Sequence, residues 1–580
     1  RLHPAPTGIA RVYAPDGAFL GLGTPKDGQL SIVQLFEPVY RRMNMHFYRS
    51  SSELSTSTPR SVALGVFDGL HPGHRAVIAA ALQAGNGYCT VYTFRSGTVT
   101  TKAPNRQLCT DEERRRLLEQ QDVTELIEED FAAVRALTPE AFVDTILRDR
   151  FHATALTCGY NYRFGKDGAG DVALLQTLCA QRHMALTVVP PVSVDGQPVS
   201  ATAIRQQLAA GDMPAVRRRL SRCWGLSLPV VSGQHLGGRL GMPTVNQPIP
   251  AALALPRFGV YASAVEIGDE TYVGVTNIGI RPTVGAAAPL AETWIQDFSG
   301  DLYGQTVRVY PVEFLRPEQK FADLDTLTAQ VHRDAAAARA VFAPTGRIRA
   351  VLFDYDDTLH RRDDAFSAAA ADFVARYYPE RSAAAQAALA RDMVAVNDYG
   401  YRMPCSYSEF IARYLPSSGE PTEKDIVRGL RYFCLAFAGR CRLLPDAAAT
   451  LTALRRRGLR LGLITNGDSR LQNDKVDLSG LRPLLDLSAV SGDEGIHKPD
   501  PRLFRRVAAR LGVAAADCLF VGDNVRNDIE GALGAGMQAA WIDIGHPAEH
   551  PSYDRPVPAA ARRVHCLGEL LALPELAEKP

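Results

Sequence analysis

Two histidines stand three positions apart after a short apolar stretch near the start of the chain. The stretch Ser61 to Phe67 runs into G-V-F-D-G-L-H-P-G-H, and the helix-like segment A-V-I-A-A-A-L comes next. A strand, a glycine turn and a helix start together favour an anion, because the helix N–H groups and dipole point toward it. His71 and His74 could both turn ring N–H groups toward a nucleotide phosphate under attack. The alternative is two unrelated surface histidines, because short motifs recur by chance.

Two carboxylates end an apolar strand in the last third of the chain. The segment V-L-F-D-Y-D-D-T-L begins at Val351 and contains Asp354 and Asp356. Side chains two residues apart on a strand face the same side, which suits a nucleophile paired with a general acid and base. Alone, the pattern could equally be a metal-binding loop or a helix cap. Three polar segments come after it in order: L-I-T-N-G-D (463–468), H-K-P-D-P (497–501) and F-V-G-D-N-V-R-N-D (520–528).

A third polar pattern is V-S-A-T-A-I-R at 199–205. Ser200 and Thr202 can donate hydroxyl hydrogen bonds at a helix start, and Arg205 offers a bidentate fork to phosphate oxygens. Simple N-capping is the alternative explanation of the two hydroxyls.

Length and composition limit the class of protein. A chain of 580 residues predicts about three or four domains, and 46% apolar with 22% charged residues is typical of a soluble globular protein. A net charge of +1 argues against a nucleic-acid or membrane partner held by electrostatics. Ten scattered cysteines without a C-x-x-C pair suggest neither a zinc site nor a disulfide framework, so a cytoplasmic location is expected. No signal peptide or membrane-spanning apolar run is visible.

The elements that would position these residues change character along the chain. From 45 to 222, strands (88–94, 153–158, 185–189) alternate with helices (111–121, 139–148), which predicts a parallel α/β sheet. From 223 to 345, short strands (260–265, 272–276, 307–312) predict a small closed barrel with a covering helix at 322–341. From 346 to 580, α/β alternation returns with a helical insertion at 362–440. Three arginine clusters, 114–116, 217–219 and 455–457, are expected on solvated helix faces.

Residues 1–42 differ in character from the rest of the chain. They read as two strands around a D-G turn and then a third, and the first methionines, Met43 and Met45, come just after them. The segment resembles the C-terminal tail of bacterial tRNA pseudouridine synthase B, without the catalytic aspartate region of that family. We therefore expect a fragment of an upstream reading frame, and an ordinary small β extension is the alternative.

The first α/β region resembles a known transferase module. G-V-F-D-G-L-H-P-G-H, C-G-Y-N-Y-R-F-G-K-D-G-A-G-D (158–171) and the S-x-T-x-x-R segment are similar to the adenylyltransferase module of bifunctional bacterial riboflavin kinase/FAD synthetase. The resemblance implies a Rossmann-like nucleotidyltransferase fold that binds the ATP triphosphate and adenylylates FMN. The triphosphate ligands would be His71, His74, Ser200, Thr202 and Arg205, with Asn161 near the adenine and ribose. Ala201, Ala203 and the segment Thr93–Ser96 depart from the family pattern, so weakened adenylylation is expected.

The barrel region resembles the riboflavin kinase module of the same family. Its motifs are G-R-L-G-M-P-T-V-N (238–246), V-T-N-I-G-I-R-P-T (275–283) and A-E-T-W-I-Q-D-F (291–298). By this resemblance Thr244 and Asn246 hold Mg-ATP, including its metal, and Glu292 is the base that deprotonates the ribityl hydroxyl of riboflavin. Phosphoryl transfer needs a positioned hydroxyl, a base and a metal, which agrees with this set. Glycines 237, 238 and 241 would admit phosphates, although any barrel also needs glycine turns.

The four ordered acidic and polar segments of the third region are similar to the haloacid dehalogenase (HAD) superfamily of phosphatases. By that resemblance Asp354 is the nucleophile, Asp356 the acid and base, and Lys498 neutralises charge. Thr465 and Asn466 would contact the phosphoryl group. The Mg²⁺ ligands would be Asp354, the Asp356 carbonyl, Asp523 and Asp528. A solvated loop lysine and a helix cap are the alternatives for Lys498 and Asp528.

The sequence therefore predicts a multidomain enzyme that makes FMN from riboflavin and FAD from FMN with Mg²⁺ and ATP, fused to a phosphatase for a phosphate monoester. Small-molecule substrates are expected, with no nucleic-acid or membrane partner, and the oligomeric state stays open. In the alternative, the first module binds nucleotide without efficient FAD synthesis. The expected phosphatase substrate is a riboflavin-pathway phosphate, and the alternative is a general nucleotidase or sugar phosphatase.

Overall fold

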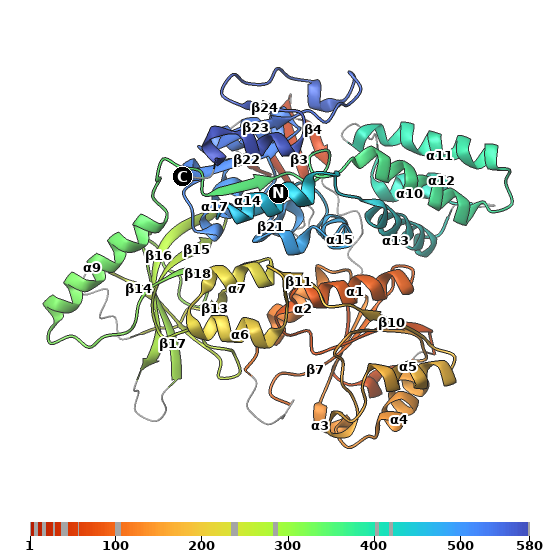
Figure 1. Ribbon diagram of the computed structural model, residues 1–580, viewed down its shortest axis with the longest axis horizontal. Coiled ribbons are helices and arrows are strands. Elements are labelled where there is room, and N and C mark those ends of the chain that lie inside the picture. The colour runs from red at the N-terminus through yellow and green to blue at the C-terminus, as the bar shows by residue number, and fades with distance from the viewer. Residues whose placement is uncertain are drawn as a thin grey trace.

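A computed structural model of the chain describes residues 2–4, 10–13, 19–26, 29–35, 45–55, 57–98, 106–233, 242–281, 288–400, 405–416 and 421–577 (Figure 1). Four sheets of four or more strands succeed one another along the chain. Within the described ranges, no helix is long and apolar enough to cross a membrane.

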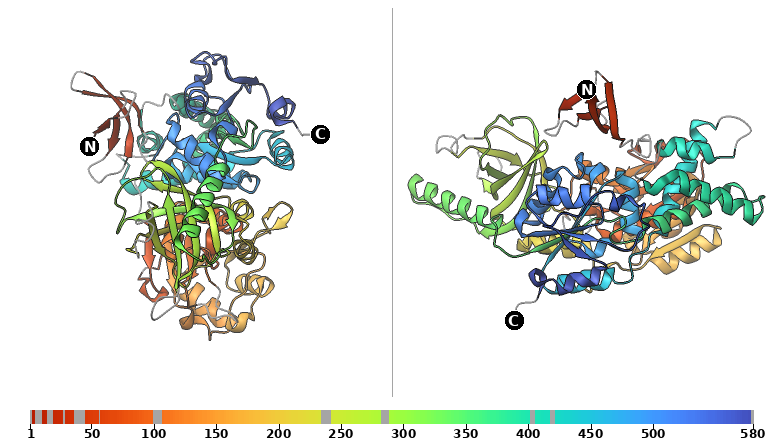
Figure 2. Two further views of the ribbon diagram at one scale, coloured as in Figure 1. Left: turned by 90° about the vertical axis from the view of Figure 1, so that its left-hand side faces the viewer. Right: turned by 90° about the horizontal axis from the view of Figure 1, so that it is seen from above.

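The N-terminal strands form an antiparallel sheet in chain order, and Figure 2 shows it at the edge of the molecule. Its strands are β1 (Leu2–Pro4), β2 (Ala10–Tyr13), β3 (Phe19–Lys26) and β4 (Gln29–Leu35). Strands β2 to β4 correspond to the three expected from the sequence, and β1 is additional.

The next sheet is parallel, with the strand order β10-β9-β6-β7-β8-β5. Its strands are β5 (His46–Tyr48), β6 (Arg60–Leu64), β7 (Thr90–Phe94), β8 (Glu125–Glu129), β9 (Ala153–Gly159) and β10 (Ala185–Val189). All five residues of β6 are buried, because helices cover both faces of a parallel sheet. The main helices are α1 (Pro72–Ala84), α2 (Asp111–Glu119), α5 (Val172–Gln181), α6 (Ala201–Ala210) and α7 (Met213–Leu220), with the π-helical η3 at Phe142–Arg150. The predicted alternation is therefore present.

The third sheet is antiparallel and nearly closes into a barrel, with the order β13-β18-β15-β16-β17-β14. A single bridge, Val231 to Asn246, joins its two ends. The strands are β13 (Leu226–Pro229), β14 (Thr244–Pro248), β15 (Gly259–Ile267), β16 (Glu270–Arg281), β17 (Ala288–Ile295) and β18 (Thr306–Arg316). Helix α9 (Leu324–Val341) packs on β15 and β16, where the sequence predicts a covering helix.

The last sheet is again parallel, with the order β21-β20-β19-β22-β23-β24. Its strands are β19 (Ala350–Phe353), β20 (Arg460–Thr465), β21 (Leu487–Val490), β22 (Cys518–Gly522), β23 (Gln538–Ile542) and β24 (Arg562–Val564). Between β19 and β20 the chain forms helices α10 (Arg362–Tyr377), α11 (Ala383–Asn397), α12 (Tyr407–Tyr414) and α13 (Glu423–Arg440). Later helices include α14 (Ala447–Arg456), α15 (Ser469–Leu478), α16 (Ser491–Glu494) and α17 (Pro501–Leu511).

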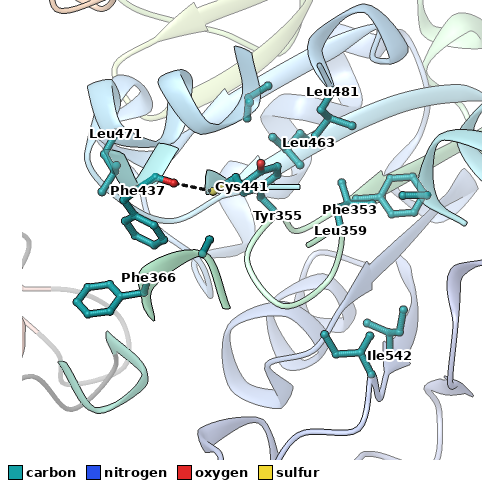
Figure 3. Packing of buried hydrophobic residues seen from close by; sticks show 14 of the residues in the cluster. Phe353, Tyr355, Leu359, Phe366, Phe437, Cys441, Leu463, Leu471, Leu481 and Ile542 are labelled. Carbon is teal, nitrogen blue, oxygen red and sulfur yellow. Dashed lines mark hydrogen bonds between the residues drawn. The ribbon is translucent and has the colours of Figure 1, made fainter. Parts of the chain in front are cut away.

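One apolar core joins the last sheet to the inserted helices (Figure 3). Phe353 and Tyr355 at the end of β19 belong to the same buried cluster as Phe366 of α10 and Phe437 of α13. Each of these four side chains is fully buried. Because aromatic side chains bury large areas, the insertion is held firmly beside the end of β19.

Buried arginines connect the last α/β region to the first α/β region. Arg75 of α1 donates to Asn473 of α15 over 2.9 Å and pairs with Asp477, and Arg431 of α13 pairs with Asp122 over 3.0 Å. Figure 1 shows α1 lying directly below α15 and α13. Arg75 and Arg431 are 5% and 1% exposed, so these contacts are interior ones.

The prediction that the arginine clusters lie on solvated helix faces is wrong for Arg114 and Arg217. Arg114 is 1% exposed and pairs with Glu128 over 2.8 Å. Arg217 is 3% exposed and donates to the backbone oxygen of Arg510. Local charge patterning could not reveal these contacts, because their partners come from a neighbouring strand and from another region of the chain.

Replacing Arg510 by methionine should destabilise the contact between the barrel and the last region. Arg510 bridges Glu266 of β15 (2.6 Å) and Glu494 of α16, and all three side chains are at most 9% exposed. Methionine keeps the apolar stem but leaves the buried Glu266 carboxylate without its cation, while Glu494 keeps only its longer pair with Arg506 at 3.4 Å. Breaking a buried ion pair typically costs about 3–5 kcal/mol. Calorimetric unfolding of the full chain measures the loss. Arg555→Ala, which breaks an exposed pair with Glu530, is the control; equal losses in both variants would contradict the prediction.

Candidate active sites

The first candidate site lies where the loop after β6 enters α1. Phe67 and Leu70 adopt positive φ values of 51° and 38°, and His71 occupies the N-cap position of the helix. The rings of His71 and His74 stack with their centroids 3.7 Å apart. The two imidazoles therefore lie side by side at a helix N-terminus, where an anion is favoured.

Both imidazoles of this site are deeply buried. Burial lowers the pKa of His71 to about 4 and lowers the pKa of His74 well below its ordinary value. Nδ1 of His74 is buried without a hydrogen-bond partner among the described residues. The pair is therefore neutral near pH 7 and keeps hydrogen-bonding capacity for a ligand.

Arg205 of α6 reaches this loop from a distant part of the chain. Its Nη2 lies 2.5 Å from Oδ2 of Asp68, and its Nε donates to the backbone oxygen of Arg106 over 2.7 Å. Asp68 is 2% exposed and also accepts from the backbone N–H of Leu108. The fold thus brings Arg205 next to the H-P-G-H loop. Sequence reasoning missed Asp68, although a carboxylate inside an anion-binding loop itself indicates a need for a cationic partner.

The other predicted ligands of this site occupy more ordinary positions. Ser200 caps α6, and its Oγ accepts from the backbone N–H of Ala203 over 3.2 Å, so its capping role is present in this structure. Thr202 and Asn161 are exposed. Asn161 comes after β9, which is the parallel neighbour of β6, so it stands at the same sheet edge as the histidines. Thr93, in the atypical segment, donates to the Val66 oxygen over 2.8 Å and supports the loop.

The second candidate site is a set of facing residues on three barrel strands. Asn246 of β14 stands opposite Glu292 of β17, and Asn277 of β16 stands opposite Glu292 on its other side. Thr244 pairs likewise with Trp294. Because opposite residues share a face of the sheet, Thr244, Asn246 and Glu292 lie on one face, as their proposed common role requires.

The opposite face of these strands fills the barrel. Ser263, Thr276 and Thr293 are fully buried there and form a hydrogen-bonded row with distances of 2.8 and 2.9 Å. Neighbouring residues on a strand alternate between faces, so the predicted kinase residues point away from the interior. Trp294 meets His332 of α9 edge-on. Glycines 237, 238 and 241, which the sequence places near phosphates, lie outside the described residues.

The third candidate site begins with Asp354 at the end of β19. Its Oδ1 lies 2.7 Å from Nζ of Lys498, and the same nitrogen lies 2.7 Å from Oδ1 of Asp528. The carboxylates of Asp354, Asp523 and Asp528 come within 4.8 Å of one another and are buried. Lys498 is 2% exposed and is therefore not a solvated loop residue.

The three buried carboxylates repel one another. Burial raises the pKa of Asp354 to about 7 against the opposing charge of Lys498, and burial with the charge of Asp528 raises the pKa of Asp523 well above its ordinary value. A hard divalent cation prefers carboxylate oxygens and would relieve this repulsion. The donor set thus fits Mg²⁺.

Asp356 lies at the centre of a second polar network. It accepts from Nζ of Lys475 at 2.9 and 3.0 Å, from Nε2 of Gln472 at 3.0 Å, and its Oδ1 lies 2.7 Å from Nε2 of His360. Burial alone would raise the pKa of Asp356, but the charge of Lys475 and the contact with His360 hold it well below its ordinary range. The carboxylate is therefore ionised and held in one orientation.

Sequence reasoning missed Lys475, Gln472 and His360. His360 comes four residues after Asp356, and Gln472 and Lys475 stand three apart on α15, so they share a helix face. Of these features, the sequence alone could predict only that Gln472 and Lys475 share a helix face. Thr465 and Asn466 are close by: Gln472 donates to Thr465 Oγ1 over 2.7 Å, and Asn466 exchanges two hydrogen bonds with the Lys498 backbone.

Comparison with protein families gives three adjacent matches. Residues 54–203 match the FAD synthetase family, residues 220–342 the riboflavin kinase family, and residues 348–536 the haloacid dehalogenase-like hydrolase family. The chain also aligns with a crystal structure of a HAD phosphatase from Thermococcus onnurineus, at 24% identity and a TM-score of 0.26, covering 39% of this chain and 97% of that one.

Curated relatives match the first part of the chain over almost their whole length. The bifunctional riboflavin kinase/FMN adenylyltransferases of Pseudomonas fluorescens and Escherichia coli K12 are each 34% identical, over 307 and 293 residues. Each alignment covers 49% of this chain and 93% of the relative. The chain thus belongs to the bifunctional riboflavin kinase/FMN adenylyltransferase family and carries, beyond those two modules, a HAD-like hydrolase domain.

Proposed function

We propose that this protein phosphorylates riboflavin to FMN in the barrel, adenylylates FMN to FAD in the first α/β domain, and hydrolyses a phosphate monoester in the HAD-like domain. The domain limits are those of the sequence patterns: 45–222, 223–345 and 346–580, the last with a helical cap at about 362–440. The observation that carries the proposal is the convergence of distant motif residues at each site, such as Arg205 beside the H-P-G-H loop.

The kinase step rests on Glu292, with Asn246 and Asn277 on the flanking strands. Glu292 takes the proton of the ribityl 5′-hydroxyl, the oxygen attacks the γ-phosphorus of ATP, and the bond to the β-phosphate oxygen breaks to release ADP. Thr244 and Asn246 would hold Mg-ATP, whose cation neutralises charge on the phosphates.

The adenylyl transfer rests on the His71 and His74 pair. An oxygen of the FMN phosphate attacks the α-phosphorus of ATP, and pyrophosphate leaves. Two imidazoles at a helix N-terminus, with Arg205 beside them, can stabilise the charge that develops on the phosphates. Ser200, Thr202 and Asn161 would complete the ATP contacts.

The rival function of the first domain is nucleotide binding without catalysis, and Ala201 and Ala203 within the binding segment favour it. Incubation of the full chain with FMN and Mg-ATP separates the two. FAD formation supports the synthetase. If no FAD forms while riboflavin is still converted to FMN, the synthetase function is refuted and the binding role stands.

The phosphatase step proceeds through an aspartyl phosphate. The Asp354 carboxylate attacks phosphorus and the ester P–O bond breaks. Asp356, which is ionised in this structure, takes up a proton from solvent when the substrate binds and delivers it to the leaving oxygen; water, deprotonated by Asp356, then hydrolyses the acyl phosphate. Lys498, Thr465 and Asn466 hold the phosphoryl oxygens. Mg²⁺ held by Asp354, Asp523, Asp528 and the Asp356 carbonyl would supply further charge neutralisation.

The fused phosphatase needs a phosphate monoester as its substrate. The fusion to flavin enzymes favours a phosphorylated riboflavin precursor, namely the ribitylamino-pyrimidine phosphate. FMN is disfavoured because its hydrolysis would reverse the neighbouring kinase. Phosphate release from a panel of this compound, FMN, nucleotides and sugar phosphates tests the proposal. Equal rates across the panel would favour a general nucleotidase or sugar phosphatase.

Replacing Lys475 by methionine should impair the phosphatase and shift its pH dependence. Lys475 lowers the pKa of Asp356, so its removal raises that pKa. Because the base must be ionised, the acid limb of the kcat profile should move to higher pH, and kcat should fall on the order of 10²-fold as the carboxylate loses its orientation. The Lys475→Arg variant should return the acid limb of the kcat profile to its wild-type pH, because arginine keeps the positive charge. An unchanged profile in the methionine variant would contradict the prediction.

We infer that residues 1–42 take no part in these reactions. On their sequence resemblance we propose that they derive from the tail of a tRNA pseudouridine synthase B; the antiparallel sheet β1 to β4 is equally compatible with an ordinary small β extension. Deletion of this segment should leave riboflavin kinase activity intact, and loss of that activity would contradict the assignment.

A further inference from the structure

A cluster of two histidines and one aspartate lies next to the phosphatase residues but is used by none of the steps above. The cluster contains Asp357, the residue directly after Asp356, and His546 and His550, which lie in the segment after β23. One ligand atom from each residue lies within 4.8 Å of the other two. The three come from separate parts of the chain, so the tertiary structure creates the group.

The spacing of the cluster leaves room between its members. His546 Nε2 lies 3.9 Å from Asp357 Oδ1, and His550 Nε2 lies 3.7 Å from Asp357 Oδ2. Both distances are too long for hydrogen bonds. Around a tetrahedral cation with bonds of about 2.0–2.1 Å, ligand atoms stand about 3.3 Å apart. The rings of His546 and His550 stack with their centroids 3.8 Å apart and 8° between their planes, so one ring would have to rotate before both Nε2 lone pairs could face one ion. The distances to Asp357 then need to shorten by only about 0.5 Å to reach this separation.

Two of the converging atoms are buried and lack a protein partner. Asp357 is 1% exposed; its Oδ1 accepts from the backbone N–H of Arg362 over 2.9 Å. Oδ2 of Asp357 and Nε2 of His546 have no hydrogen-bond partner among the described residues. An unsatisfied buried carboxylate oxygen is costly, and a cation placed between these atoms would satisfy both.

The second ring nitrogen of His550 is tied to the carboxylate site. His550 Nδ1 lies 2.9 Å from Ser552 Oγ, and that hydroxyl donates to Asp523. Since the hydroxyl proton is committed to Asp523, Oγ can accept from a protonated Nδ1, which leaves the Nε2 lone pair facing Asp357. The Ser552 backbone N–H, 3.2 Å from Nδ1, favours the other tautomer, so binding of a cation would select between the two.

The donor set also selects the class of cation. Two imidazole nitrogens and one carboxylate suit Zn²⁺ and similar transition-metal ions such as Co²⁺. Mg²⁺ prefers oxygen ligands, which the neighbouring Asp354, Asp523 and Asp528 provide. The two groups of ligands therefore differ in chemistry although they are linked through Ser552.

We propose that Asp357, His546 and His550 form a second metal site for a zinc-like divalent cation, separate from the magnesium site of the phosphatase. The ion would tie the segment after β23 to the loop after β19. Tyr399, from the inserted helices, meets His550 edge-on with ring centroids 4.7 Å apart, so the site lies at the junction between the insertion and the sheet. A fourth coordination position would be left for water or a substrate group.

Titration with Co²⁺ tests this site directly. The untagged full-length protein, stripped of metal and held in saturating Mg²⁺, should bind one equivalent of Co²⁺ with a visible absorption band of tetrahedral type, and X-ray absorption should show two imidazole ligands and no sulfur. His546→Ala and His550→Ala should each weaken this binding about 100-fold or more. Riboflavin kinase activity of each variant reports that the chain is folded.

Matched variants control for nonspecific binding. His565→Ala and Cys566→Ser change exposed side chains on a nearby segment and should bind Co²⁺ like the wild type. Co²⁺ binding that is unaffected in the His546 and His550 variants would overturn the proposal. So would binding that Mg²⁺ displaces completely, because it would place the ion at the three aspartates.

Discussion

Replacing Asp354 by asparagine is expected to abolish phosphate release while both flavin activities remain. The amide cannot attack phosphorus, and loss of a catalytic nucleophile typically costs about 10⁴-fold or more in kcat. The change keeps the size of a side chain that touches Lys498 within the last domain. The riboflavin kinase and adenylyltransferase residues lie in other sheets, so their rates should not change. Phosphate release, FMN formation and FAD formation are measured on one preparation. They check the loss of phosphatase activity and the retention of both flavin activities.

A direct test of the intermediate accompanies this variant. Acid quench of the wild type during turnover, followed by mass spectrometry, should find phosphate on the peptide that contains Asp354. Asp372→Asn is the matched control, because Asp372 of α10 forms a solvent-accessible pair with Arg440 of α13, and this variant should retain full activity. If Asp354→Asn keeps appreciable phosphatase activity, Asp354 is not the nucleophile.

Glu292→Gln should remove riboflavin kinase activity and spare FAD synthesis from supplied FMN. Glutamine keeps the shape of the side chain on β17 but cannot accept the ribityl proton, and general base catalysis typically contributes about 10²–10⁴-fold. The loss should appear in kcat more than in the KM for ATP, because Thr244 and Asn246 are unchanged. Separate assays from riboflavin and from FMN measure the two activities.

The neighbouring carboxylate provides the competing explanation. Glu318 accepts a hydrogen bond from Asn277, whose backbone pairs with Glu292, so it also lies close to this face of the barrel. Glu318→Gln should retain most kinase activity, and Glu270→Gln, exposed at the start of β16, should retain all of it. Loss in the Glu318 variant with retention in the Glu292 variant would move the base to Glu318.

Local sequence was sufficient for most of the elements. The alternation of apolar and polar residues predicts the parallel strands β7, β9 and β10, the barrel strands and α9, because period and turn residues are properties of neighbouring positions. It also placed Asp354 at a strand end and His71 at a helix start. These positions need only the strand or helix to which each residue belongs.

The contacts that a side chain makes with distant parts of the chain could not be predicted from local sequence. Arg114 and Arg217 lie in stretches that pattern as solvated helix faces, yet both are buried against groups from elsewhere in the fold. Lys475 and Gln472 hold Asp356 from a helix more than a hundred residues away. Such contacts depend on how sheets and helices pack, which residue spacing within one segment does not encode.

The sequence by itself determined the chemistry that this protein carries: a histidine pair at a helix start, a Thr-x-Asn and Glu set on a barrel, and paired aspartates after a buried strand. Each is a local combination of residue type and backbone geometry. The tertiary structure decided how those groups are held and what they touch, including the Asp68–Arg205 pair, the Lys475–Asp356 pair and the cluster of Asp357, His546 and His550. The physical reason is that burial and pairing arise only when distant segments pack together and exclude water.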